Sequence, residues 1–320
     1  MTFTPWIRNG IAALVGSLVL AAAAQAGAPQ VKTQAPGFYR MMLGDIEITA
    51  LNDGTLDLQP KQLLTNTTQQ EVGKLLGKGF QKDVVQTSVD GYLVNTGSKL
   101  VLVDTGAGSL FGPTLGKLVA NLKASGYQPD EVDEVYITHL HPDHVGGLMA
   151  GDSMAFPKAI VRADRHDADY WLNKGAIATA RESDRPFFEG AMKSLKPYSA
   201  AGRFKTFDGN TQLVPGISAV PARGHTLGHT TYVVESKGQK LLLWGDLIHV
   251  AAVQFADPSI TIEFDTDPRA AAIQRKKAFA DAAKQGYWVA GAHLPFPGIG
   301  HLRSEGKGYS FVPANYAPAP

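Results

Sequence analysis

The order of apolar and polar residues along the chain predicts strands and helices in alternation. From Phe38 the run FYRMMLGDIEITAL has period two around a Gly-Asp turn, and residues 88–106 hold two apolar runs separated by Thr96-Gly97-Ser98. Both patterns are typical of β-hairpins. Apolar residues at positions 115, 118, 119 and 122 have helical spacing, and Gly126 is expected to end that helix.

The second half of the chain continues this alternation. Strands are expected at residues 159–163, 217–220, 230–235, 241–246 and, as the last one, 287–291. Helices are expected from Val145, over 164–172, and over 267–286, where Asp267 and Gly286 provide the start and stop signals. Residues 173–190 are polar and predict a long mobile loop. Because no linker separates the two halves, we expect an extended arm at 27–36 and a single α/β domain over 37–320.

The N-terminus has the pattern of a secretory signal peptide. Arg8 precedes an apolar run from Ile11 to Ala24, and Ala24-Gln25-Ala26 forms a small-residue cleavage site. The apolar run is shorter than the ~20 residues that span a bilayer, and an uncleaved anchor is the alternative. We therefore expect residues 1–26 to be a signal peptide cleaved after Ala26, which would leave a periplasmic or secreted protein.

Charge and cysteine content narrow the classes of partner and site. The 320 residues contain 30 Lys and Arg against 29 Asp and Glu, and residues 1–26 include one of the basic residues. This balance argues against a nucleic-acid or membrane-surface partner. The chain contains no cysteine. Disulfides are therefore absent, and any metal must be held by histidine and carboxylate side chains.

Chemically active side chains are concentrated in THLHPDHVGG, residues 138–147, directly after the strand-like run EVYI. Imidazole and carboxylate both bind divalent cations, and His139 and His141 can face one ion from a strand end. Asp143 and His144 can face a neighbouring ion. A polar turn of solvated histidines is the alternative, but this segment holds three of only nine histidines in the chain. The sequence therefore favours a metal site.

Three further polar residues stand where predicted strands end. His225 follows a strand in RGHTLGH, Asp246 ends LLLWGD, and His293 follows VAGA. A carboxylate buried at a strand end without a partner would be costly. Any one of them could be a hydrogen-bonded polar residue without a metal. Together they complete a set of seven candidate ligands, in which Asp246 can bridge two ions.

The pattern H-x-H-x-D-H, followed by a distant His, a strand-end Asp and a last His, resembles the metal-binding pattern of the metallo-β-lactamase superfamily. The resemblance implies an αββα sandwich, with two mixed sheets flanked by helices. It also implies two ligand sets: His139, His141 and His225 for one metal, Asp143, His144 and His293 for the other, with Asp246 between them. Asp104, in VLVDTG, matches the aspartate that supports this site from behind the ligands.

A longer resemblance, over nearly all of residues 37–316, relates the chain to the exported methyl parathion hydrolases and to lactone and aryl-ester hydrolases similar to them. Segments such as FYRMMLGDIEITALNDGT and FPGIGHLRSEGKGY carry it. It implies a substrate pocket rimmed by Phe111, Trp171 and Phe187, whose rings would stack on an aryl leaving group.

Four pocket positions depart from the methyl parathion hydrolase pattern. Leu63 replaces a basic residue, His249 replaces an aliphatic one, and Ile262 and Phe264 replace smaller side chains. The bulkier His249 and Phe264 predict a narrow pocket, which favours planar lactone and ester carbonyls over phosphotriesters with three projecting groups. A hydrogen-bonded strand histidine is the alternative reading of His249.

These features predict an exported binuclear metal hydrolase of lactones and aryl esters such as dihydrocoumarin, with secondary phosphotriesterase activity. Two divalent ions, with zinc as the expected metal and manganese, cobalt or iron as alternatives, would lower the pKa of a shared water toward 7. Asp143 and Asp246 would orient that water and handle its proton. The alternatives are a primary organophosphate hydrolase of the methyl parathion hydrolase type and a non-catalytic metal-binding module. A small molecule is the expected partner, and the resemblance leaves a homodimer open.

Overall fold

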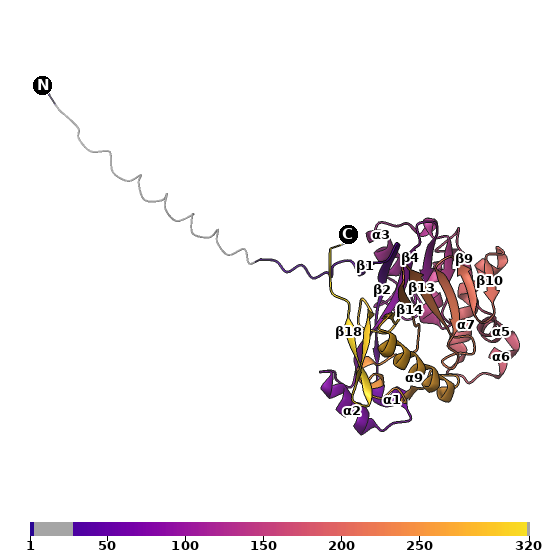
Figure 1. Cartoon of the computed structure of the whole chain (residues 1–320). Coiled ribbons are helices and arrows are strands. Elements are labelled where there is room, and N and C mark those ends of the chain that lie inside the picture. Colours follow the sequence, from indigo (N-terminus) through magenta and orange to yellow (C-terminus); the bar gives the residue numbers. More distant parts are fainter. Residues whose placement is uncertain (3–27, 319–320) are drawn as a thin grey trace. The chain divides into compact units, whose positions relative to one another are not determined.

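The structure is a computed structural model that describes residues 1–2 and 28–318 (Figure 1). The predicted signal peptide, apart from its first two residues, lies outside the described residues. The described residues from Pro36 onward belong to one compact unit, Pro36–Pro320, which does not include residues 28–35. Residues 28–36 of the predicted arm carry neither helix nor strand. Among the helices that the structure describes, none combines the length and the apolar character needed to cross a bilayer.

Two seven-stranded sheets form the centre of the unit Pro36–Pro320. The strands of the first, in spatial order, are β1 (Phe38–Leu43), β2 (Ile46–Leu58), β4 (Val85–Asn95), β5 (Leu100–Val103), β6 (Glu134–Tyr136), β9 (Ile160–Asp164) and β10 (Phe204–Phe207). Those of the second are β11 (Thr211–Val214), β12 (Ile217–Pro221), β13 (Thr230–Ser236), β14 (Gln239–Leu243), β16 (Trp288–Ala290), β17 (Ile299–Glu305) and β18 (Gly308–Pro313). Two short pairs complete the set: β3 (Leu64–Thr65) with β15 (Thr261–Ile262), and β7 (Met149–Ala150) with β8 (Ser153–Met154).

Helices pack against the outer face of each sheet: α3 (Leu118–Ala124), α5 (Arg165–Trp171) and α7 (Arg185–Ala200) on the first, and α9 (Pro268–Gln285) on the second. Helices α1 (Pro60–Leu63), α2 (Gln69–Lys78) and α8 (Ala251–Gln254) pack on one another. The structure also describes the short helices α4 (Pro142–Val145) and α6 (Lys174–Thr179), and 3-10 turns at Pro129–Glu131 and Gly146–Leu148. Figure 1 shows α5, α6 and α7 grouped beside β9 and β10, and α9 near β18. The layers therefore follow the order helix, sheet, sheet, helix, and the predicted αββα sandwich is confirmed.

Separate apolar cores hold these layers together. The inner faces of the two sheets meet in one cluster, in which Ile48, Val103 and Tyr232 are buried. A second cluster joins the first sheet to α3 and α7 through residues such as Leu122 and Phe188. A third packs α9 onto the second sheet, through Phe279 and Val289 among others. Burial of apolar surface contributes about 25 cal/mol per Å² to the free energy of folding. Because the clusters are separate, each one stabilises a different pair of layers.

Strand direction brings the polar strand ends to one region. Strands β5, β6, β9 and β10 run parallel to one another, as do β14 and β16. In α/β sheets, ligands bind outside the carboxyl ends of parallel strands. Asp104, His139, Asp246 and His293 all follow such carboxyl ends.

Several local predictions are confirmed. The two expected hairpins are β1–β2 and β4–β5. Helix α9 begins after Asp267, whose side chain accepts a hydrogen bond from the backbone N–H of Ala270, and it ends at Gly286 with a φ of 67°. These caps are specified by the local sequence, which is why the pattern alone located them.

Other local predictions are wrong. Residues 173–190 form α6 and the start of α7 instead of a long loop, because Asn173 caps α6 and Phe188 is buried in the core behind α7. The strand at 287–291 is not the last, since β17 and β18 follow it. The strand expected over 241–246 ends at Leu243, because Gly245 has a φ of 55°, which is incompatible with a strand.

Candidate metal centre

The motif of residues 138–147 lies where the chain leaves β6 and turns into α4. His139 and His141 precede the helix, while Asp143 and His144 lie inside it, so the helix begins earlier than the predicted Val145. Pro142 occupies the first helical position, where its fixed φ favours the turn. The three histidines are at most 4% exposed. Their imidazoles therefore point into the protein and not into solvent, which contradicts the solvated-turn alternative.

Three other loops bring the remaining predicted residues to this point. His225 lies between β12 and β13, Asp246 follows β14, and His293 follows β16. The structure brings together all seven predicted ligands in two adjoining groups of side chains able to hold a metal ion. One group is His139, His141, His225 and Asp246, and the other is Asp143, His144 and His293.

Asp246 lies between the two groups. Its Oδ2 is 3.3 Å from Nε2 of His225 and 3.2 Å from Nε2 of His293, and its Oδ1 is 3.2 Å from Nε2 of His144. One carboxylate therefore contacts an imidazole of each group. This is the position that the sequence assigned to a bridging residue.

The contact between His144 and Asp246 suits a bound cation. The Nδ1 of His144 lies 2.8 Å from the Asp104 carboxylate, so the ring carries its N–H there. In the neutral ring, Nε2 then carries a lone pair, which faces Oδ1 of Asp246. Both atoms are buried, and neither has a hydrogen-bond partner. Two acceptors face each other without repulsion only if a positive charge lies between them.

The spacing of the donor atoms also fits metal ions. Nε2 of His225 is 3.2 Å from Nε2 of His139 and 3.1 Å from Nδ1 of His141. A tetrahedral site with metal–nitrogen bonds of ~2.0–2.1 Å has ligand–ligand edges of about 3.3 Å. The residues present therefore fit two divalent cations, and the clusters indicate a binuclear metal site.

Groups behind the histidines fix which nitrogen faces the site. His144, His225 and His293 direct Nδ1 away from the centre, toward Asp104 at 2.8 Å, Asp265 at 2.9 Å and the carbonyl of Ser88 at 2.9 Å, respectively. Such partners hold an imidazole in one tautomer and one orientation. Asp104 also accepts hydrogen bonds from the backbone and the hydroxyl of Thr138, so it occupies the supporting position that the resemblance implied.

The electrostatics of the centre favour cations. Burial, together with the nearby His144, lowers the pKa of His139 well below its usual range, and it keeps that ring neutral. Burial alone would raise the pKa of Asp246, but the surrounding histidines hold it well below its usual range. The site thus presents an ionised carboxylate surrounded by imidazole rings, and these two ligand types together form the donor set of a divalent cation.

Asp167, a residue that the sequence did not single out, joins two of the ligand loops. Its carboxylate accepts hydrogen bonds from the backbone N–H of Leu140, which lies between His139 and His141. It also accepts from the hydroxyl of Thr226 and the N–H of Gly228, which follow His225. Burial raises its pKa to about 6. No short motif marks Asp167, because its three partners lie in other segments.

Replacing Asp167 by alanine should therefore loosen both loops together. Two backbone N–H groups would lose their buried acceptor, at about 1–3 kcal/mol each, so we expect a loss of at least ~2 kcal/mol in the free energy of unfolding and weaker metal retention. Urea unfolding and metal analysis measure these effects. Asp169→Ala, on the same helix and paired only with Arg165 at the surface, is the matched control. Equal stability of the two variants would refute the role of Asp167.

His229 is a second residue that the sequence did not assign, although it stands in the quoted segment RGHTLGH. Its Nε2 accepts from the backbone N–H of Asp246 at 3.0 Å, and its Nδ1 donates to the carbonyl of Ala222 at 3.0 Å. Gly245 makes the approach possible, because a Cβ there would lie 2.8 Å from Nε2 of His229. His229 therefore positions the backbone of the bridging residue.

A cavity of about 540 Å³ opens onto the metal-binding residues. His141, Asp143, Asp246 and His293 form its floor, and its walls include four of the predicted pocket residues, Phe111, Phe187, His249 and Phe264, together with Leu56 and Leu58. Phe111 is 43% exposed and stands at the rim. The cavity is thus predominantly apolar in its walls and polar at its floor, as ligand sites commonly are.

The structure places the other three predicted pocket residues elsewhere. Trp171 is buried and packs edge-on against the ring of His141, with 5.0 Å between the centroids. Ile262 is fully buried, and both it and Trp171 line a neighbouring cavity of about 500 Å³. Leu63 is absent from the linings of both cavities, because it packs against an apolar cluster that includes Leu58 and Val253. The assignment of Leu63 to the pocket is therefore wrong.

His249 occupies an unusual position. Its ring stacks on that of His293, with 5.2 Å between the centroids, and its Nε2 is 3.1 Å from Oδ2 of Asp246. It lies beyond β14, and neither ring nitrogen makes a hydrogen bond. His249 is therefore not a strand histidine. It belongs to the wall of the cavity, and with Asp246 and His293 it forms a further group of side chains close enough to hold an ion.

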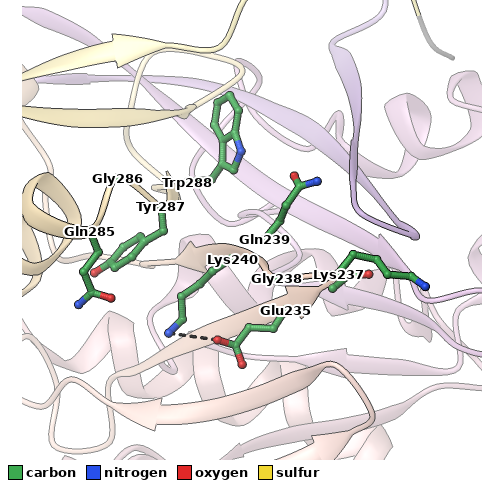
Figure 2. Close-up of a pocket in the computed structure, with 10 residues that line it drawn as sticks. Glu235, Lys237, Gly238, Gln239, Lys240, Gln285, Gly286, Tyr287 and Trp288 are labelled. Carbon is green, nitrogen blue, oxygen red and sulfur yellow. Dashed lines mark ion pairs between the residues drawn. The ribbon is translucent and has the colours of Figure 1, made fainter.

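A larger open pocket, of about 640 Å³, lies away from these residues (Figure 2). The turn between β13 and β14 and the residues between α9 and β16 line it, and Lys240 pairs with Glu235 across it at 3.1 Å. Its lining includes no histidine or aspartate and a single glutamate, which Lys240 already neutralises. The smaller cavity at the histidine cluster is therefore the functional one.

Known proteins resemble this chain in sequence and structure. The profile of the Metallo-beta-lactamase superfamily matches residues 85–301. The N-acyl homoserine lactonase of Bacillus cereus is 25% identical over 205 residues, which are 58% of this chain and 74% of that protein.

Solved structures extend the likeness to most of the chain. The crystal structure of the hydrolase AbOPH in the beta lactamase superfamily has a TM-score of 0.85 and 40% identity, covering 89% of this chain and all of that one. AidC, a dizinc quorum-quenching lactonase in complex with a product, has a TM-score of 0.82 and 27% identity, covering 88% and 99%. Fold, site and relatives agree: the chain belongs to the metallo-beta-lactamase superfamily and is a metal-dependent hydrolase.

Proposed function

We propose that this hydrolase acts on lactones and aryl esters, such as dihydrocoumarin, and that phosphotriesters are secondary substrates. The observation that carries the proposal is a His/Asp centre at the floor of a cavity with aromatic walls. The lactonase relatives support the substrate class, and the dizinc relative supports zinc as the metal. We place the chain with the methyl parathion hydrolase and aryl-ester lactonase group within the superfamily, on the sequence segments that resemble it.

The residues of the chain have distinct parts in the reaction. Bound divalent cations would supply Lewis acidity and a water whose pKa lies near 7. His139, His141 and His225 would hold one cation, Asp143, His144 and His293 the other, and Asp246 would contact both. Asp143, whose side chain is 13% exposed, reaches the cavity, so it can accept and return a proton on the substrate side.

The walls of the cavity support the proposed order of substrates. The rings of Phe187 and Phe264 lie 6.4 Å apart between centroids, and those of Phe264 and His249 lie 6.1 Å apart. These three rings form a continuous wall beside the floor. A planar aryl lactone can stack along this wall, whereas a phosphotriester projects groups in three directions and meets it with at least one.

A comparison of kcat/KM tests this order. We expect dihydrocoumarin to exceed methyl parathion by about tenfold or more, which corresponds to about 1.4 kcal/mol in transition-state binding. The kcat/KM for an N-acyl homoserine lactone, which has no aryl group, should be measured as well. It distinguishes a preference for aryl substrates from a preference for lactones in general. A tenfold advantage for methyl parathion would instead identify a primary phosphotriesterase.

We also propose that the protein is exported, on the signal-peptide pattern of residues 1–26. N-terminal sequencing of the protein from the producing cell tests this. Gly27 is the expected first residue, and an intact Met1 in the soluble fraction would contradict export.

A further inference from the structure

Asp265 makes a buried contact with a metal-binding histidine. Its Oδ1 lies 2.9 Å from Nδ1 of His225, and its side chain is fully buried. Nε2 of the same ring faces His139 and His141. The ring of His225 is thus held between a carboxylate on one side and the metal-binding group on the other.

The other oxygen of Asp265 holds the wall of the substrate cavity. Oδ2 accepts the backbone N–H of Ile262 at 3.2 Å, and the N–H of Asp265 donates to the carbonyl of Ile262 at 3.0 Å. These two hydrogen bonds close the turn 262–265, which carries Phe264 into the wall. The backbone N–H of Thr266 also donates to the carbonyl of His225 at 2.8 Å, so the turn and the histidine loop are joined twice.

Arg275 anchors this arrangement from α9. It is fully buried, and its guanidinium donates to the carbonyls of Leu247 and Ile260 at 2.5 and 2.6 Å. Its Nη2 lies 3.8 Å from Oδ2 of Asp265. A buried carboxylate needs such a countercharge. The Arg275 side chain therefore ties the segment after Asp246 to the segment that leads into the turn.

We propose that Asp265 is a positioning residue that couples the metal centre to the specificity wall. One oxygen keeps His225 in the tautomer that offers Nε2 to the metal, and the other sets the turn that places Phe264. Outer carboxylates of this kind change metal affinity by about 10–100-fold when they are removed. The part that concerns His225 rests on the metal centre alone and would stand if the lactone proposal failed. The part that concerns Phe264 rests on the proposed lactone hydrolysis.

Metal titration of the purified full-length protein tests the first half. In Asp265→Asn, we expect one of the two equivalents of Zn²⁺ or Co²⁺ to bind about 10–100-fold more weakly, while the other keeps its affinity. Asp257→Asn is the matched control: Asp257 is exposed, lies in the same segment, and its side chain accepts hydrogen bonds only from Ser259. Its two equivalents should bind as in the unmodified protein. Unchanged binding in Asp265→Asn, or equal weakening of both equivalents, would overturn the proposal.

Nitrogen-15 NMR of the unmodified zinc-loaded protein provides a test that needs no variant to fold. We expect the His225 ring to carry a proton on Nδ1 that exchanges slowly with water, because it is buried against Asp265. A proton on Nε2 would contradict the assignment.

For the wall, the ratio of kcat/KM for an aryl lactone to that for a small aliphatic lactone should fall in Asp265→Asn and not in the control. An unchanged ratio would refute the proposed coupling between Asp265 and Phe264.

Discussion

Replacing Asp246 by alanine should sharply reduce hydrolysis and remove at least one of the two metal ions. The carboxylate contacts imidazoles of both ligand groups, within 3.2–3.3 Å of His144, His225 and His293. Without it, five buried histidine rings face one another with no negative charge between the groups. Loss of several kcal/mol of transition-state stabilisation lowers kcat/KM by about 10³-fold or more. Metal analysis should show no more than about one ion per chain, where the unmodified protein holds about two.

Asp208→Ala is the matched control for this prediction. Asp208 belongs to another group of His and Asp side chains, with Asp164 and His166, that could hold an ion. It is half-exposed, and Arg165 and Arg223 already pair with it. The adjacent guanidinium groups repel a cation, so loss of the Asp208 carboxylate should change neither activity nor metal content. An Asp246→Ala enzyme with two ions and near-normal activity would disprove the bridging role.

Removing the metal from the unmodified protein should have an effect of similar size. Dialysis against a chelator is expected to eliminate lactone hydrolysis, and added Zn²⁺, Co²⁺ or Mn²⁺ should restore it, because no cysteine is present to act as a thiolate nucleophile. The apo protein should also unfold at a lower temperature. At a free metal concentration a thousand times the dissociation constant, metal binding stabilises the folded protein by about 4 kcal/mol.

Metal removal and restoration also distinguish the proposed hydrolase from the alternative functions. A protein that binds two ions with full stabilisation but turns over no ester, lactone or phosphotriester would be a metal-binding module. Hydrolysis that survives exhaustive metal removal would instead require a nucleophile among the protein side chains. The order in which metals restore kcat, with zinc expected first, identifies the metal that the His and Asp ligands prefer.

Much of the fold could be predicted because its signals are local. The β1–β2 hairpin needs only a Gly-Asp turn between alternating runs, and α9 needs only Asp267 and Gly286 at its ends. The same holds for the metal centre: His139, His141, Asp143 and His144 lie within six positions. The prediction failed at residues 173–190, where polar residues on the outer face of α7 obscure the buried Phe188.

Residue type and short spacing were enough to identify the side chains that could bind metal and the alternation of strands and helices. The residues that support and surround the metal-binding side chains became visible only once distant segments were packed together. Asp167, His229 and Asp265 act through hydrogen bonds to segments up to 61 residues away, and Leu63 turned out to face an apolar cluster instead of the cavity. Burial and hydrogen bonding are properties of contacts between distant segments, so no pattern within one segment carries them.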